Sequence, residues 1–424
     1  MTYQPPLYNA VKDYAENTIS RFHMPGHGGR GDMGFLSGVS KYDLTELKET
    51  DNLADARGVI SEAQELAARK FSSDAVLFSC MGATLCIQGA LYAAMKIKPN
   101  SKVYCCRQVH KSVINAFSLM DVEPEWLSEL SDRDFSDGGI LIYTHTDYYG
   151  NIADLELIKK IKQNNDIIII ADNSHGSHLA FFEDGKLHPT RHGVDFSVDS
   201  LHKTLPVLTG GACLNLKDKL YSRLCREGMT LFGSTSPNYL IMASVDRAIS
   251  QVSESVLLKT RDAIEKFKSE LPQFFDNNHQ KYRDPFRMVL KCANPEELYD
   301  VLYDNSVKCE FYDDNGVVLI VPYGADVGYF EPLKNVLKKY NPGEYHSLSI
   351  PSYNIPEKKL SIRSAVFSES IDVPLLESGG KVSAREYSLY PPGIPIIVPG
   401  EVFDENIIAK LSGVYDTVKI IKES

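Results

Sequence analysis

Residues 167–172 read Ile-Ile-Ile-Ile-Ala-Asp, five apolar residues followed by one carboxylate. Continuous runs of β-branched and aliphatic residues are typical of parallel strands that are buried on both faces. Similar runs occur at 75–78, 140–143 and 211–214, and a shorter one occurs at 196–198. Segments with helical patterning separate most of these runs. The sequence therefore predicts an α/β fold with a large, mostly parallel sheet and right-handed crossovers.

The same patterning predicts three parts of the chain. Residues 1–20 are expected to form a helical arm that follows two prolines, and residues 21–255 a large α/β domain. Residues 256–424 are expected to form a smaller α+β domain, with strands near 286–291 and 317–321.

Composition excludes several classes of protein. The 424 residues include 45 Lys+Arg and 56 Asp+Glu, giving a net charge of −11, with 43% hydrophobic and 24% charged residues. These values are typical of globular proteins, and the absence of a long basic run argues against nucleic-acid binding. No apolar run approaches the roughly 20 residues of a spanning helix, so no membrane partner is expected. Eight cysteines are too few for a disulfide framework, and no secretory signal precedes the arm, so a cytoplasmic location is expected.

Polar residues follow the predicted strands, at the edge where open α/β sheets bind ligands. Asp172 ends one strand, and a buried carboxylate needs a cation or hydrogen-bond donors unless it caps the next helix. Lys203 follows another strand. Partial desolvation would lower its pKa and suit it to Schiff-base formation, whereas an ordinary lysine would lie at the surface.

Two further groups of residues carry possible chemistry. Gly82-Ala83-Thr84 lies between a strand and a helix, where free N–H groups and a hydroxyl form either a phosphate site or an ordinary turn. Histidines gather in the first half of the chain, and the pair at 175 and 178 beside Asp172 leaves a metal-dependent hydrolase open as an alternative. These histidines are His23, His27, His110, His175, His178 and His202.

Four of these residues match the needs of an electron-sink cofactor. Such a cofactor requires a lysine, an acid at its pyridine nitrogen, phosphate donors at a helix start and a group against its ring. Lys203, Asp172, Thr84 and His110 supply these four functions in that order.

Three segments resemble those of a known family: Phe22–His27, His202–Pro206, and Tyr390–Pro395 with Pro399–Glu401. They resemble the ornithine/lysine/arginine decarboxylases, which are pyridoxal 5'-phosphate enzymes of the aspartate-aminotransferase fold. The resemblance runs from about Pro6 to Glu401, and the length is similar to the short form of the family without a wing domain.

The resemblance implies particular roles. Lys203 would hold the cofactor, Asp172 would keep its pyridine nitrogen protonated, and His110 would stack on its ring. Ser236 would lie in a segment that reaches the neighbouring subunit, which implies a homodimer or a higher homo-oligomer. The cofactor-binding positions implied are Lys203, Asp172, His110, Ala83, Thr84, Ser174, His175, Ser200, His202 and Ser236.

The chain also departs from the family pattern. Where the family commonly has Asp-Glu-Ala-His, residues 172–175 read Asp-Asn-Ser-His. Ala83 replaces a hydroxyl residue in the phosphate loop, and Asp147 stands at a place often held by Thr. These differences predict altered cofactor affinity and substrate choice.

The resulting functional hypothesis is the decarboxylation of a basic L-amino acid, with proton donation to Cα by Lys203 or His202. Arginine, lysine or ornithine would give agmatine, cadaverine or putrescine, products of polyamine metabolism. Candidates for binding the distal cation are Glu401, Glu310 and Asp313.

Three alternatives stay open. An aminotransferase or carbon–carbon lyase would use the same lysine and aspartate, and would need an arginine, such as Arg363, for a retained carboxylate. The others are a non-enzymatic homologue and the metal-dependent hydrolase.

Overall fold

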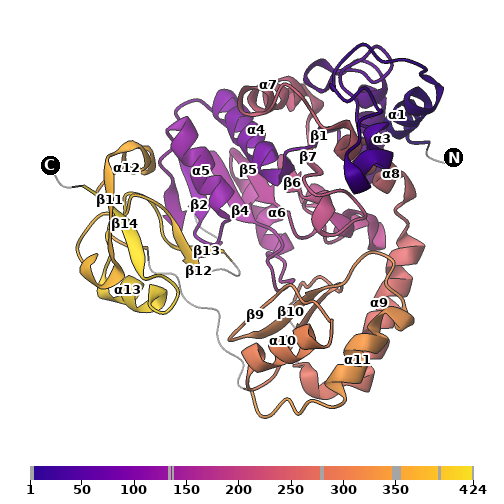
Figure 1. The fold of residues 1–424 in the computed structure, drawn as a ribbon. Helices are drawn as coiled ribbons and strands as arrows, with labels where there is room; N and C mark the ends of the chain where they lie inside the picture. The colour runs from indigo at the N-terminus through magenta and orange to yellow at the C-terminus, as the bar shows by residue number, and fades with distance from the viewer. Residues whose placement is uncertain are drawn as a thin grey trace.

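The five predicted runs belong to one seven-stranded sheet with the order β1-β7-β6-β5-β4-β2-β3, in which β2 and β3 are additional strands (Figure 1). The computed structural model describes residues 4–131, 135, 138–276, 281–345, 355–389 and 393–422. Strands β2 to β6 are mutually parallel, which confirms the predicted α/β class. The strands are β1 Ala75–Ser79, β2 Val103–Cys106, β3 Glu125–Leu127, β4 Gly139–Thr144, β5 Ile167–Asp172, β6 Phe196–Asp199 and β7 Ala212–Leu216.

Strand β7 runs antiparallel to both β6 and β1. The connection from β6 to β7 contains a single turn of 3-10 helix, Leu201–Lys203, instead of a crossover helix. A parallel return needs a long crossover, so this short connection reverses the strand direction. The predicted lysine lies on this connection.

Both faces of the sheet are covered, which explains the continuous apolar run at β5. Ile168 and Ile170 pack in the core beneath α4 and α5, while Ile167 and Ile169 pack in the core beneath α6. The helices around the sheet include α3 Val59–Phe71, α4 Gly82–Ile97, α5 Lys111–Met120, α6 Leu155–Asn164 and α7 Ser222–Phe232.

Helices also form the predicted arm and the link to the next part of the chain. The arm contains α1 Pro6–Asn17, which buries Leu7 and Val11. Two helices follow the large sheet, α8 Tyr239–Gln251 and α9 Glu254–Glu270, separated where Val252 and Ser253 adopt extended backbone angles.

Two smaller units follow along the chain. The first is an antiparallel sheet with the order β8-β10-β9, and it contains both strands predicted in this region. The second, the C-terminal unit (described residues 355–389 and 393–422), holds two antiparallel strand pairs. The boundary at residue 255/256 stays a prediction. Elements of the two units are β8 Arg287–Leu290, α10 Pro295–Asp304, β9 Phe311–Asp313, β10 Gly316–Ile320, α11 Glu331–Leu337, α12 Ile362–Phe367, β11 Ser370–Pro374, β12 Tyr387–Leu389, β13 Ile394–Ile397, α13 Glu405–Leu411 and β14 Thr417–Ile421.

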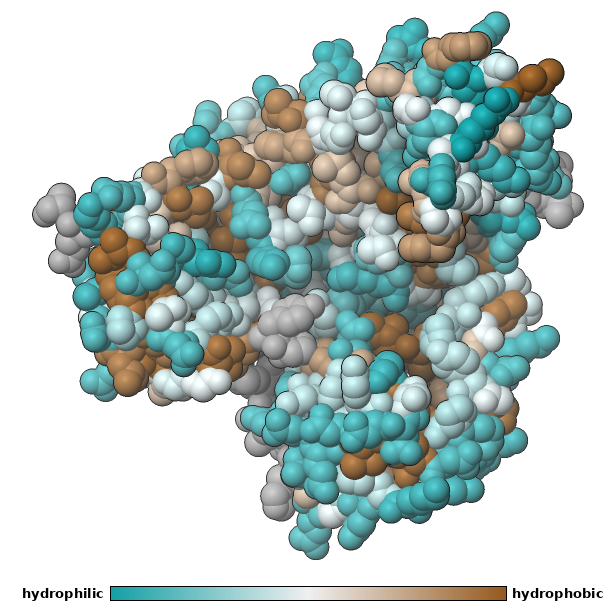
Figure 2. Space-filling view, in the orientation of Figure 1, coloured by the Kyte–Doolittle hydropathy of each residue, from teal (hydrophilic) through white to brown (hydrophobic). Residues whose placement is uncertain are grey.

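The two smaller units differ in their surfaces. Figure 2 shows a mostly hydrophilic face over the β8–β10 unit at the bottom and groups of hydrophobic residues over the C-terminal unit at the left. Tyr390, Pro391 and Pro392 of the proline-rich motif lie outside the described residues. Within the described ranges, no helix is both long and apolar enough to span a bilayer.

Candidate active site

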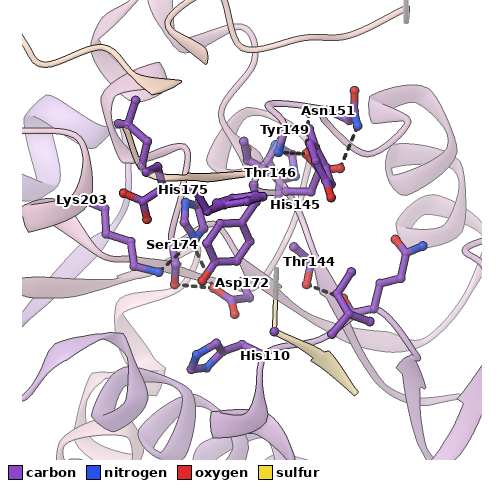
Figure 3. A pocket seen from close by; sticks show the side chains of 18 of the residues that line it. His110, Thr144, His145, Thr146, Tyr149, Asn151, Asp172, Ser174, His175 and Lys203 are labelled. Carbon is purple, nitrogen blue, oxygen red and sulfur yellow. Dashed lines mark hydrogen bonds between the residues drawn. The ribbon is translucent and has the colours of Figure 1, made fainter. Parts of the chain in front are cut away.

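A cavity of about 1980 Å³ opens at the carboxyl ends of the parallel strands. Its walls come from the large sheet, from β9 and β10, and from the β12–β13 hairpin. Figure 3 shows a close view of its lining. The predicted residues that line it are Ala83, Thr84, His110, Asp172, Ser174, His175, Ser200, His202 and Lys203.

Asp172 ends β5 and is buried at the cavity wall. Ser174 donates two hydrogen bonds to Oδ1 of this carboxylate, from its hydroxyl at 2.5 Å and from its backbone N–H at 3.1 Å. Among the described residues, no donor bonds Oδ2. One oxygen is thus fixed by the protein, while the other is available to a ligand in the cavity.

Lys203 lies beside Asp172 and contacts a histidine (Figure 3). Its Nζ is 3.0 Å from Nε2 of His175. Burial lowers the pKa of Lys203, the carboxylate of Asp172 opposes this change, and the guanidinium of Arg287 adds to it. Burial and the charge of Lys203 hold the pKa of His175 well below its ordinary value, so its neutral ring accepts the hydrogen bond.

His110 precedes α5 and serves as its N-cap. The backbone N–H of Ser112 donates to Nδ1 of His110 at 3.2 Å, and the hydroxyl of Ser112 lies 2.8 Å from the same atom. These contacts fix the ring orientation through the start of the helix. Burial lowers the pKa of His110 while Asp172 raises it, so a neutral ring faces the cavity.

The start of α4 forms another wall of the cavity. Gly82 adopts a left-handed backbone angle (φ +73°), and its N–H donates to the carbonyl of Gly210 at 2.7 Å. Ala83 and Thr84 follow in the first turn, where helix N–H groups have no partner four residues earlier. These N–H groups and the Thr84 hydroxyl are donors suited to an anion.

The Lys203 loop adds polar groups to that wall. Nδ1 of His202 lies 3.2 Å from the carbonyl of Gly211 and 3.4 Å from the hydroxyl of Ser200. Because a carbonyl only accepts, Nδ1 carries the proton and Nε2 is left as an acceptor. Burial lowers the pKa of His202, which favours this neutral form.

Family models match most of this chain. A family model described as "Orn/Lys/Arg decarboxylase, major domain" matches residues 5–140 and 130–322, and one described as "Orn/Lys/Arg decarboxylase, C-terminal domain" matches 353–415. The chain belongs to the Orn/Lys/Arg decarboxylase family. It is accordingly a carboxy-lyase by family membership.

Relatives of this decarboxylase cover nearly its whole length. An arginine decarboxylase of Halalkalibacterium halodurans is 27% identical over 96% of this chain and 92% of its own length. An arginine decarboxylase of Bacillus subtilis is 24% identical over 96% and 93%. The lysine decarboxylase structure of Francisella novicida superposes with a TM-score of 0.83 at 19% identity, covering 99% of this chain and 81% of that one, and shares the fold.

Some residues predicted for the decarboxylase site lie outside the cavity lining. Ser236 is exposed, and its N–H bonds the hydroxyl of Ser234 at 3.1 Å. Arg363 donates from Nη1 to the carbonyls of Ser118 and Leu119, both at 3.1 Å. Their proposed roles stay predictions.

The three carboxylates that were predicted to bind the substrate are separated. Glu401 is buried and forms an ion pair with Arg107 outside the cavity lining. Glu310 and Asp313 line the cavity, and Asp313 accepts hydrogen bonds from the hydroxyl of Tyr149 and the N–H of Asn315.

The remaining histidines do not converge. Nε2 of His178 lies 3.0 Å from Asp284, His23 bonds Tyr14, and His27 bonds Asp43. In the described part of the chain, no group of three His, Cys, Asp or Glu is arranged to hold a metal ion. This geometry gives the metal-dependent hydrolase no support.

Asp199 is a neighbour of the site that sequence reasoning did not select. It ends β6 and accepts hydrogen bonds from four side chains at 2.8 to 3.0 Å. Burial would raise the pKa of Asp199, but His188 and the hydrogen bonds of Ser197 and Asn173 lower it. The strand-end argument used for Asp172 applies equally here and could have found it. The four donors are Asn173, His188, Ser197 and Asn215.

This carboxylate explains one departure from the family pattern. Nδ2 of Asn173 donates to Asp199 at 2.8 Å, and Oδ1 of Asn173 accepts from the hydroxyl of Thr146 at 3.0 Å. A glutamate at position 173 would place a second buried carboxylate against Asp199, which is unfavourable. The asparagine is therefore matched to Asp199.

Arg287 and Tyr148 are also neighbours of the site that were not selected. Nη2 of Arg287 donates to the carbonyl of His175 at 3.2 Å, and the Tyr148 ring centroid lies 4.0 Å from that of His175. An arginine inside the apolar run at 286–290 was the available signal, because a buried guanidinium needs partners.

Proposed function

We propose that this decarboxylase binds pyridoxal 5'-phosphate and removes the α-carboxylate of arginine, lysine or ornithine. The observation that carries the proposal is the convergence of a buried lysine, Lys203, and a buried carboxylate, Asp172, on one cavity. The expected products are agmatine, cadaverine or putrescine, which belong to polyamine metabolism.

The donor set fits this cofactor. The first turn of α4, Thr84 and Ser200 offer donors to a phosphate, and Oδ2 of Asp172 can accept from a protonated ring nitrogen. Two buried polar atoms at the cavity, Nδ1 of His175 and Oγ1 of Thr204, have no hydrogen-bond partner among the described residues. Such atoms usually have a partner when a site is filled.

When bound, the cofactor accepts the electrons released as the bond between Cα and the carboxylate breaks. Asp172 would hold a proton on the ring nitrogen, and Ser174 would keep the carboxylate oriented for that contact. Lys203 supplies an amine whose lowered pKa increases the neutral, nucleophilic fraction. Lys203, or His202 after taking up a proton at Nε2, would then deliver a proton to Cα of the product.

The far wall of the cavity suits a distal cation. Glu310 and Asp313 provide negative charge, and the rings of Tyr148 and Phe311 meet with centroids 5.9 Å apart. Carboxylates beside aromatic faces attract guanidinium and ammonium groups. This wall supports a basic substrate without selecting one of the three.

A second copy of the chain is the proposed partner. Residues Ile19, Phe22 and Phe35 are 85%, 99% and 95% exposed. All three lie within residues 19–35 of the chain, and large apolar side chains exposed to this degree are candidates for an interaction surface. The exposed position of Ser236 is consistent with its proposed contact with a neighbouring subunit. We also propose a cytoplasmic location, where the eight free thiols would stay reduced.

A competition assay tests the proposal. The purified protein is incubated with pyridoxal 5'-phosphate and equal amounts of lysine, ornithine and arginine, and the amines are identified by mass spectrometry. We expect one amine, lost in Lys203→Ala and kept in Lys159→Ala, a matched change at an exposed lysine on α6. Cofactor absorbance without any amine would favour an aminotransferase or lyase. Absence of both would favour a non-enzymatic homologue.

A further inference from the structure

A buried ion pair joins the C-terminal unit to the large sheet. Nη1 and Nη2 of Arg107 bond the two carboxylate oxygens of Glu401 at 2.8 and 2.7 Å, and both side chains are 1% exposed. Nη2 of Arg107 also donates to the carbonyl of Ile396 at 3.2 Å, and the N–H of Val398 donates to Glu401 at 2.8 Å. This bidentate geometry fixes direction as well as distance.

The ion pair acts on the segment that carries His110. Arg107 directly follows β2, and its backbone bonds Leu127 on one side and Val109 on the other. His110 comes three residues after Arg107 and caps α5. Arg107 and His110 are thus joined by a short segment of backbone, in which the N–H of Val109 donates to the carbonyl of Arg107 at 2.9 Å.

The C-terminal unit also holds the other end of α5. Arg363 donates to the carbonyls of Ser118 and Leu119, in the last turn of the helix. There the positive charge of Arg363 also interacts favourably with the negative end of the helix dipole. Glu123, just beyond α5, bonds the N–H of Ile362 at 3.1 Å and Nζ of Lys358 at 2.8 Å.

Apolar contacts and the cavity wall complete this arrangement. Ile362 and Val398 of the C-terminal unit belong to the same buried cluster as Val113 and Phe117 of α5. Ile396, whose carbonyl bonds Arg107, lines the cavity. The C-terminal unit thus contacts both the helix and the cavity.

We propose that Glu401 and Arg107 are positioning residues, through which the C-terminal unit sets the place of His110 in the active site. The proposal rests on the proposed function, because His110 matters as the ring that faces the cofactor. Neither residue lines the cavity, so their effect passes through the backbone of residues 107–110.

The main test is Glu401→Gln, which keeps the side-chain shape and removes the charge. Hydrogen exchange of residues 107–114 is measured without cofactor, and cofactor affinity, its visible circular dichroism and kcat are measured with it. We expect faster exchange at 107–114, a changed dichroism band and about tenfold weaker cofactor binding, since a charge-assisted contact is lost. Asp372→Asn is the matched control, because it removes an exposed ion pair with Lys419 inside the C-terminal unit.

A double variant separates positioning from stability. Replacing both members of a buried ion pair with apolar residues often preserves stability, so Arg107→Met with Glu401→Met should restore the melting temperature. Under the proposal, the dichroism band and kcat stay altered in this double variant. If the melting temperature, the dichroism band and kcat all returned to their wild-type values in the double variant, the proposal would be overturned.

The remaining outcomes also decide the proposal. If Glu401→Gln does not fold, Arg107→Lys is measured in its place, because it keeps the charge and removes the bidentate contact. Unchanged exchange and cofactor signals in that variant would contradict the proposal. If the wild-type protein binds no cofactor, the proposed function fails. The exchange measurement then still decides whether the ion pair holds residues 107–114.

Discussion

Strands β5 and β6 are parallel neighbours, and each ends in a buried aspartate. Asp172 lines the cavity and, within the part of the chain that the structure describes, receives hydrogen bonds from one residue, Ser174. Asp199 receives hydrogen bonds from four side chains on different parts of the chain and is not part of the cavity lining. The same residue type at the same edge of the sheet therefore serves two purposes. A carboxylate with spare acceptor capacity is suited to a ligand, and one with full capacity is suited to holding the fold.

The largest expected effect is on catalysis at Asp172. Asp172→Asn removes the charge that would keep the ring nitrogen protonated, so kcat should fall about a thousandfold. The melting temperature should change little, because Ser174 alone among the described residues donates a hydrogen bond to this side chain. Steady-state kinetics and thermal melts check both points, and an Asp172→Asn protein that fails to fold would contradict the comparison.

Asp199 should show the reverse pattern. Asp199→Ala leaves four buried donors without their acceptor, and the free energy of unfolding should fall by about 3–5 kcal/mol. Urea unfolding measures this loss. The contrast with Asp172 would be wrong if Asp199→Ala matched the wild type in stability and lost only activity.

The end of a third strand, β4, extends the comparison to the pH dependence of stability. His145 follows β4, and burial lowers its pKa to about 3. The unfolded chain takes up a proton at this histidine below about pH 6.5, while the folded protein does so only near pH 3. Stability from this group is thus present above pH 6.5 and is lost as the pH falls, by about 2 kcal/mol between pH 7 and pH 5.

His145→Gln should remove that dependence, because glutamine does not titrate. Urea unfolding of wild type and variant at pH 7 and pH 5 provides the measurement. Equal losses of stability in the two proteins would show that other groups control the acid response.

The smallest expected effect is at Ser174. Ser174→Ala keeps the backbone donor to Asp172 and removes the hydroxyl donor, so the carboxylate loses one of the two hydrogen bonds that orient it. We expect kcat to fall by about three- to tenfold, with a shift in the pH profile of the cofactor absorbance, since one hydrogen bond to a charged group is lost. An unchanged pH profile would show that the hydroxyl does not act on the carboxylate.

Local patterns explain what the sequence could predict. The apolar runs at β4 and β5 are long and continuous. Asp172 ends β5 and Lys203 lies four residues after β6, so a short window of sequence suffices for each. The strands of the C-terminal unit are only three to five residues long and partly exposed, and their patterns are too short to recognise. Sequence reasoning also could not show that Glu401 pairs with Arg107, because that contact joins residues 294 positions apart.

The same separation has a consequence for synthesis on the ribosome. At about 5–20 residues per second, Glu401 is made about 15–60 seconds after Arg107. During that interval the nascent chain contains Arg107 but not Glu401. Residues 107–110, before α5, therefore lack the ion pair with the C-terminal unit. A truncated polypeptide that ends before this glutamate would therefore contain the lysine and both strand-end aspartates and still lack a finished site. Under the positioning role proposed for Glu401, the active site is complete only after the ribosome has translated residue 401.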